Sequence, residues 1–162
     1  MDDEFVKLVE RCAAKLENQM IFNASKEHAL FLYQKLFDVA ERMNEPVKIF
    51  SRKFETDFYD KLVTRIGTLL DKNIPVSLIS ECPVSELASN GFVNAVKNHR
   101  NGKFKARSTV DANSLHFILV NGSRYRYETD PNTMSARANF ADPVAGSIIE
   151  NQFNQMWATA TS

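Results

Sequence analysis

Residues 115–127 read LHFILVNGSRYRY, in which Asn121-Gly122 separates two runs rich in β-branched and aromatic residues. An Asn-Gly pair between such runs is the strongest short-range signal for a β-hairpin, because both residues readily adopt the positive φ angles of a tight turn. We therefore predict a strand at 115–120 and a second strand through Tyr125-Arg126-Tyr127.

Upstream of this hairpin, short apolar runs alternate with helical periodicity. The predicted strands are residues 19–24, 47–51 and 76–80, and residues 103–107 alternate polar and apolar side chains. The predicted helices are residues 3–17, Ser25 to Met43, Phe58 to Leu70 with Thr56 as cap, Val84 to Asn98, and 143–157 behind Asp142. The helix at 84–98 is the weakest of these, because Ser89-Asn90-Gly91 interrupts it.

This order favours an α/β fold with a mostly parallel or mixed sheet and helices on both faces, because each crossover between strands must cover the sheet. A chain of 162 residues suits one domain, which we expect to span 1–162. Lysine plus arginine and aspartate plus glutamate number 20 each, so no global field attracts nucleic acid or an anionic membrane. Any anion site must therefore be local.

The two cysteines, Cys12 and Cys82, form no CxxC or Cys/His cluster, so neither a zinc site nor a disulfide framework is indicated. No apolar run approaches the ~18–20 residues of a membrane span, and Met1-Asp2-Asp3-Glu4 is acidic where a signal peptide would be basic. We expect a cytoplasmic protein that does not associate with membranes. P-loop, GxGxxG, GxSxG and HExxH motifs are all absent, so no metal or other cofactor is expected.

Ligands of open α/β sheets bind beyond the carboxyl ends of strands, so polar residues at those positions are the first candidates. They are Asn23, Ser25, Ser51, Arg52, Lys53, Ser80, Glu81 and the regions of His116 and Asn139. Strand alternation places His116 on the same face as Ile118 and Val120. A histidine in such a run is either a hydrogen-bonded structural residue or part of a site, and the spacing alone leaves both interpretations open.

The order of elements together with the residues from His116 to Asp142 resembles the phospholipase D superfamily, whose signature is HxK(x)4D followed closely by a Gly-Ser-x-Asn-Phe-like stretch. His116 matches the histidine, and Asn139, followed by Phe140, matches the asparagine. The match is partial, because other residues occupy the remaining positions: Ile118 for the lysine, Ser123 for the aspartate, and Ala136-Arg137 for Gly-Ser.

The resemblance implies a phospholipase D-like fold and a nucleophilic His116 that forms a covalent phospho-histidine, while a partner histidine protonates the leaving oxygen. It also implies that Asn139 holds the charge of the phosphate. Because Ile118 cannot donate a hydrogen bond, we expect a catalytically degenerate site, since losing one such donor costs on the order of 100- to 1000-fold in rate. Arg137, or else Arg124 or Arg126, is a candidate replacement cation, although all three could be ordinary solvated charges.

Family members with one motif per chain pair two protomers so that both histidines meet, so the resemblance also implies a homodimer. Phe153, Met156 and Trp157 of the last predicted helix, or the first helix, could supply its apolar contacts or could equally belong to the core. A basic stretch is a further candidate for nucleic-acid contact, or else a solvated edge strand, and consists of Lys97, Arg100, Lys103, Lys105 and Arg107.

Three functions remain open from the sequence. The first is a pseudoenzyme that acts as a binding or regulatory module for phosphate-bearing ligands, DNA or RNA, or for a protein partner, as in a defence or toxin system. The second is an active, metal-independent phosphodiesterase or nuclease with His116 as nucleophile. The third is a purely structural interaction protein in which His116 has no chemical role.

Overall fold

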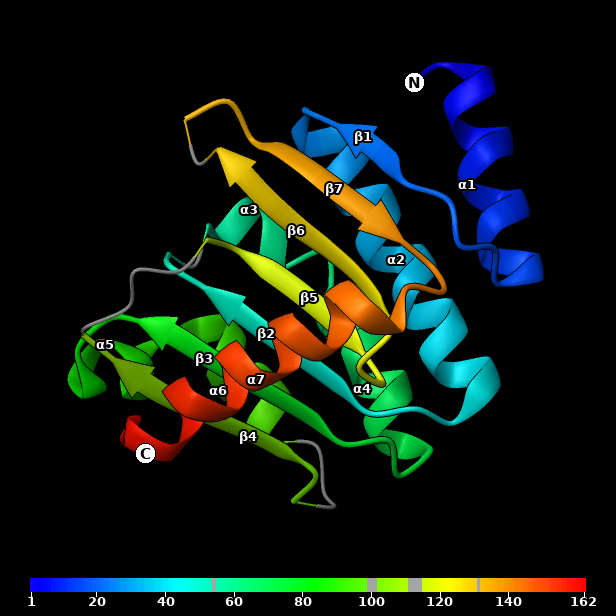
Figure 1. Ribbon diagram of the computed structural model, residues 1–162. Coiled ribbons are helices and arrows are strands. Elements are labelled where there is room, and N and C mark those ends of the chain that lie inside the picture. The colour runs from blue at the N-terminus through cyan, green and yellow to red at the C-terminus, as the bar shows by residue number, and fades with distance from the viewer. Residues whose placement is uncertain (54, 99–101, 111–114, 131) are drawn as a thin grey trace.

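The computed structural model describes residues 1–53, 55–98, 102–110, 115–130 and 132–162 (Figure 1). Its strands are β1 (Ile21–Asn23), β2 (Val47–Ser51), β3 (Val76–Glu81), β4 (Phe104–Thr109), β5 (Phe117–Val120), β6 (Arg124–Asp130) and β7 (Ser135–Asn139). Its helices are α1 (Asp3–Lys15), α2 (Lys26–Met43), α3 (Thr56–Tyr59), α4 (Val63–Asp71), α5 (Val84–Ser89), α6 (Gly91–Lys97) and α7 (Pro143–Thr159). Across the described residues, no helix has both the length and the apolar content to cross a membrane.

The strands form one mixed sheet in the order β1-β7-β6-β5-β2-β3-β4. Strands β2, β3 and β4 run parallel to one another, and the other four pairings, including that of β2 with β5, are antiparallel. The predicted α/β class with a mixed sheet is therefore confirmed. One strand was missed: Ser135–Asn139 forms β7, whose alanine-rich sequence has little intrinsic preference for a strand.

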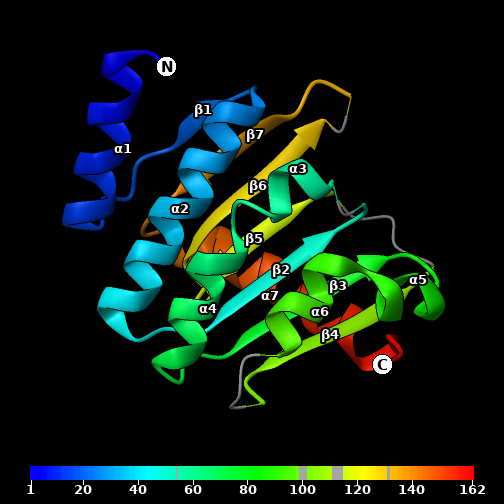
Figure 2. The same cartoon turned by 180° about the vertical axis from the view of Figure 1, so that it is seen from behind.

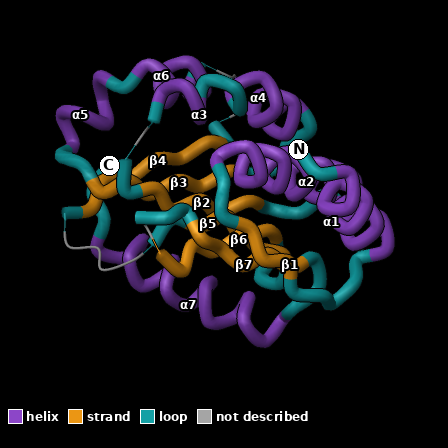
Figure 3. The backbone as a smooth tube through the Cα atoms, turned by 90° about the horizontal axis from the view of Figure 1, so that it is seen from above, coloured by secondary structure: helices purple, strands orange, loops and turns teal. Residues whose placement is uncertain are grey.

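Helices cover both faces of the sheet, but unequally. Figure 3 shows α7 alone on one face and the other helices on the opposite face, with α1 outside α2; Figure 2 shows the crowded face directly. A large apolar core lies between the sheet and these helices, and a smaller one, including Phe117, Tyr125 and Phe153, lies under α7. Because all four residues of β5 are buried, this strand forms part of both cores.

Some predicted elements have different boundaries. The helix expected from Phe58 to Leu70 is divided into α3 and α4, and the helix expected at 84–98 is divided at Asn90. The Asn90 side chain accepts a hydrogen bond from the backbone N–H of Val93, which makes Asn90 the N-cap of a new helix. Strand β5 begins at Phe117, so His116 lies immediately before the strand rather than inside it.

The Asn121-Gly122 turn is formed as predicted and fixes how α7 approaches the sheet. Asn121 and Gly122 have φ angles of 49° and 67°, both in the left-handed region. A Cβ atom placed on Gly146, in the first turn of α7, would overlap the carbonyl oxygen of Gly122. Only glycine at position 146 therefore allows the helix to lie directly against the hairpin turn.

We expect Gly146→Ala to lower the free energy of unfolding by about 1–3 kcal/mol, because the added methyl group forces the turn and α7 apart. Gly91→Ala is the matched control, since a Cβ atom on Gly91 meets nothing within 4 Å. Urea denaturation monitored by circular dichroism measures both variants. Equal stability of the two variants would show that α7 does not depend on this close approach.

Candidate phosphate-binding site

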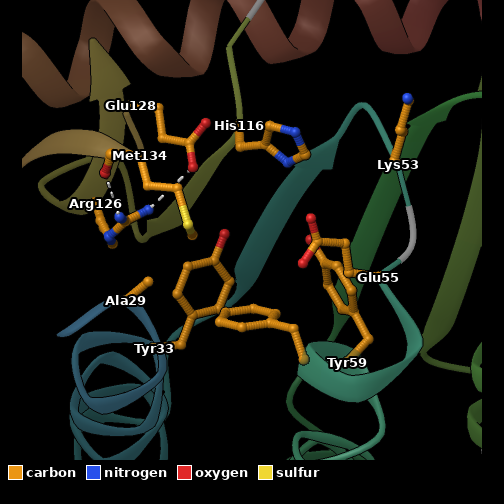
Figure 4. Close-up of a pocket in the computed structure, with 10 residues that line it drawn as sticks. Ala29, Tyr33, Lys53, Glu55, Tyr59, His116, Arg126, Glu128 and Met134 are labelled. Carbon is orange, nitrogen blue, oxygen red and sulfur yellow. Dashed lines mark hydrogen bonds and ion pairs between the residues drawn. The ribbon is translucent and has the colours of Figure 1, made fainter. Parts of the chain in front are cut away.

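The carboxyl ends of β2 and β3 meet the start of β5 and the end of β6 at one edge of the sheet. A cavity of about 90 Å³ lies there on the face covered by α2 and α3, and we call it the inner pocket (Figure 4). Its polar lining residues are Tyr33, Lys53, Glu55, Tyr59, His116, Arg126 and Glu128. The site therefore lies at the strand ends, where the sequence placed its first candidates.

His116 stands at the rim of the inner pocket. Its Nδ1 lies 3.5 Å from the hydroxyl oxygen of Ser51, which itself donates a hydrogen bond of 2.7 Å to the carbonyl oxygen of Lys53. Burial, together with the positive charge of Arg52, lowers the pKa of His116 to about 4. The imidazole is therefore neutral at pH 7, which leaves a nitrogen lone pair available as an acceptor or nucleophile.

Arg126 brings a buried cation into the same pocket. It is the register partner of Ile118 across β5 and β6, so its side chain shares a face with His116. Only 1% of Arg126 is exposed. Its Nε donates to Asn23 Oδ1 at 2.9 Å, and its Nη2 donates to the carbonyl oxygen of Met134 at 3.1 Å. The signature position that lacks a lysine thus has a guanidinium beside it on the neighbouring strand.

Glu128 is the carboxylate of the inner pocket closest to this cation. Its Oε1 lies 3.6 Å from Arg126 Nη1, and its backbone N–H donates to the carbonyl oxygen of His116 at 3.0 Å. Burial raises the pKa of Glu128, and the charge of Arg126 opposes that rise. The two residues form a buried ion pair on one strand, and both line the same pocket as His116 (Figure 4).

Two tyrosines form the floor of the inner pocket. Tyr33 comes from α2 and Tyr59 from α3, and Figure 4 shows both rings below His116. Burial raises the pKa of Tyr59 to about 12 and that of Tyr33 well above its usual value. Both phenols therefore keep their protons at neutral pH and can donate hydrogen bonds.

A wider cleft of about 690 Å³ adjoins the inner pocket, and we call it the outer cleft. The two share Lys53, Glu55 and His116, and the outer cleft adds Arg52, Glu81, Cys82, Pro83 and Glu86. Arg52 Nε donates to Glu81 Oε2 at 2.9 Å. Among the described residues, no group of three or more histidine, cysteine, aspartate or glutamate side chains is placed to hold a metal ion.

Asn139 does not join His116, so the expected convergence of the two side chains is wrong. The register aligns Asn139 with Tyr125 and Leu119, whose side chains pack under α7, whereas His116 faces the other side of the sheet. The Asn139 amide donates to Asn18 Oδ1 at 2.8 Å, and its oxygen accepts from the backbone N–H of Ala141 at 2.9 Å. These bonds satisfy the amide far from the inner pocket.

The other two candidate arginines also lie elsewhere. Arg137 lies on the α7 side of the sheet, where its guanidinium stacks 5.8 Å from the centre of the exposed Phe22 ring. Arg124 shares the face of Arg126 but stands at the opposite end of β6, where its Nη2 lies 3.1 Å from Glu45 Oε1. Of the three arginines, Arg126 alone lines the inner pocket.

The basic stretch lies apart from the inner pocket. Lys97 ends α6, and Lys103 and Lys105 are exposed at the start of β4. The Arg107 guanidinium lies 4.2 Å from the centre of the Trp157 ring and donates to the Trp157 carbonyl oxygen at 2.8 Å, so it is held by α7. Arg100 lies outside the described residues.

Sequence reasoning missed Glu128, Tyr33 and Tyr59. Glu128 follows Arg126 by two positions in a predicted strand, so the period of two already placed both side chains on one face. The tyrosines gave no comparable signal, because Tyr33 and Tyr59 look like ordinary members of apolar helix faces.

No protein-family model matches the sequence, and no curated protein matches it. Solved structures do match. NucT from Helicobacter pylori superposes with a TM-score of 0.67 at 10% identity, over 90% of this chain and 99% of that one. Nuc from Salmonella typhimurium, a phospholipase D family member, superposes with a TM-score of 0.59 at 13% identity, over 89% of this chain and 97% of that one.

The chain has a phospholipase D-like fold. A third structure, the archaeal chromatin protein TrmBL2, superposes with a TM-score of 0.67 at 11% identity over 97% of this chain. The phospholipase D-like chain spans 60% of the length of TrmBL2, whose structure is described as showing a novel mode of DNA binding. At these identities, the likeness concerns the fold.

The lowered pKa of His116 has a consequence for stability. Between the folded value of about 4 and the ordinary value of 6.5, the unfolded chain binds more protons, so stability falls as pH falls through this window. We expect the stability of the wild type relative to His116→Gln to decrease by about 3 kcal/mol from pH 7 to pH 4. Denaturant titrations of both proteins at half-unit pH steps measure this difference. Parallel curves for the two proteins would contradict it.

Proposed function

We propose that the protein is a catalytically degenerate phospholipase D-like module that binds phosphate-bearing ligands, with single- or double-stranded nucleic acid as the preferred class. The observation that carries this proposal is the buried guanidinium of Arg126 beside a neutral His116 in one pocket at the sheet edge. A planar guanidinium can bind two phosphate oxygens at once, and a neutral imidazole beside it has one N–H to donate.

The arrangement of donors supports recognition of phosphate more than it supports turnover. Tyr33 and Tyr59 line the same pocket with protonated, uncharged phenols that hydrogen-bond with each other, so they add no negative charge that would oppose a phosphate. Ile118 is fully buried in the apolar core and gives no charge-assisted contact to a developing oxyanion. Asn139, the second motif residue, is bonded on the opposite face of the sheet. Binding therefore has its donors, whereas the groups expected to lower the reaction barrier are missing.

Nucleic acid is preferred among phosphate ligands because TrmBL2, which has a similar fold, is described as a DNA-binding chromatin protein. Lys97, Lys103 and Lys105 remain candidates to follow a polyanion across the surface, outside the inner pocket. A protein partner is the other class that the degenerate site would suit. We also propose a cytoplasmic protein whose single domain spans 1–162, since both described cysteines are free and one sheet takes strands from residue 21 to residue 139.

A second candidate function, an active phosphodiesterase, is supported by the pKa of about 4 for His116. A neutral imidazole at pH 7 is the form that attacks phosphorus. In the phospholipase D family, a partner histidine completes such a site, so this alternative includes a homodimer. Phe153 is buried, and Met156 and Trp157 pack against the core under α7, so these three residues belong to the packing of α7 rather than to an exposed interface.

Binding and cleavage are separated by one experiment in EDTA with labelled single- and double-stranded DNA and RNA, including oligothymidylate. We expect binding without cleavage, and Arg126→Lys should weaken it about tenfold or more because lysine cannot reproduce the two-pronged contact. Lys15→Gln, which removes an exposed cation on α1, is the control and should bind like the wild type.

Metal-independent cleavage that disappears in His116→Ala would replace the binding proposal with the enzyme. The absence of both binding and cleavage would leave the structural interaction protein. Light scattering at micromolar concentration addresses the assembly separately, because a monomer would remove the site made from two histidines.

A further inference from the structure

The inner pocket contains its own anion directly beside its buried cation. Glu128 is 5% exposed and Arg126 is 1% exposed, and the two charged groups lie 3.6 Å apart. Among the described residues, Glu128 is the one charged partner of Arg126, since its other two contacts are the Asn23 amide oxygen and the Met134 carbonyl oxygen. The Nη1 edge that faces Glu128 is thus the edge on which a bound phosphate oxygen would compete with the carboxylate.

The charges of the inner pocket cancel as long as Glu128 is ionised. Lys53 and Arg126 supply two positive charges, Glu55 and Glu128 supply two negative charges, and His116 is neutral. Glu55 is exposed and lies 3.0 Å from Lys26 Nζ, so water and a lysine screen its charge. Glu128 is buried against the sheet, so water does not screen its charge, and its neighbouring cation is Arg126 itself. It is therefore the group that most strongly opposes a second anion.

We propose that Glu128 is an internal counter-anion that holds Arg126 until a phosphate group replaces it, and that it takes up a proton when the phosphate binds. This inference rests on the proposed function and names how the same site is regulated. The exchange is balanced: the ion pair between Glu128 and Arg126 breaks, Arg126 pairs with the phosphate, and one proton passes from solvent to a carboxylate oxygen of Glu128. Glu128 lines the inner pocket, which shares Lys53, Glu55 and His116 with the outer cleft.

The groups that face Glu128 come from every neighbouring element. They are Arg126 on its own strand, His116 before β5, Tyr33 on α2, Tyr59 on α3, and Lys53 and Glu55 after β2. Burial and the charge of Glu55 raise the pKa of Glu128, and Arg126 is the cation that opposes the rise. When a phosphate neutralises Arg126, that opposition disappears while burial remains. Protonation of Glu128 then becomes easier.

The test measures binding of oligothymidylate by isothermal titration calorimetry from pH 5 to pH 8, in buffers with different ionisation enthalpies. This probe carries fixed phosphodiester charges and no group that titrates in the range. The wild type should bind more tightly at lower pH, and its heat should depend on the buffer because a proton is taken up. Glu128→Gln should bind about tenfold or more tightly than the wild type at pH 8, with no dependence on the buffer.

Glu55→Gln is the matched control, because it removes the same charge from the same pocket at a screened position. It should change affinity less than Glu128→Gln and should keep the proton uptake. Proton uptake that persists in Glu128→Gln but disappears in His116→Gln would assign the proton to the imidazole and overturn the proposal. Wild-type binding that is independent of pH and buffer would also overturn it, without any variant having to fold.

Failure of the proposed function gives a different result. If neither the wild type nor Glu128→Gln binds oligothymidylate or duplex DNA, both proposals fall together. If the wild type binds and Glu128→Gln binds no more tightly, phosphate recognition stands and only the internal counter-anion is rejected.

Discussion

Burying the Arg126 guanidinium is the constraint on which the arrangement of the site depends. A guanidinium withdrawn from water must have its donors satisfied by fixed acceptors, because an unpaired buried charge costs several kcal/mol. Three segments supply those acceptors: Asn23 on β1, the Met134 carbonyl before β7, and Glu128 on β6. The outermost strand of the sheet, β1, is therefore linked to the inner pocket through the Arg126 side chain. Asn23 does not line the inner pocket, so an alteration at this position would act on the pocket through its hydrogen bond with Arg126.

Much of the fold was predictable because it depends on local chemistry. The Asn121-Gly122 turn, the Asp142 cap and the apolar periodicity of α1, α2 and α7 all act within a few residues, and the structure has each of them. The pairing of β1 with β7 was not predictable in this way. It joins segments more than a hundred residues apart, and the short β1 carries no pattern that names its partner.

The candidate site was predicted in position but only partly in composition. Strand ends on β2 and β3 and the histidine before β5 do meet at one edge, as the rule for open sheets expects. The prediction that Asn139 converges with His116 was wrong because it aligned residue types with the family motif and did not place Ser135–Asn139 in a strand. Within a strand, one position of register decides the face, and Asn139 has the register of the α7 side. Among the three candidate arginines, the face of the sheet and the position along the strand likewise decide which one lines the inner pocket.

The β1–β7 pairing also sets an order of events during synthesis. Residues 21–23 are synthesised more than a hundred residues before residues 136–138, which are their one neighbour in the sheet among the described residues. Strand β1 therefore cannot pair within the sheet until residues 136–138 have been made. Because Asn23 is also an acceptor for Arg126, the pocket is completed only when this pairing forms, and a nascent chain stalled before β7 carries His116 without its finished surroundings.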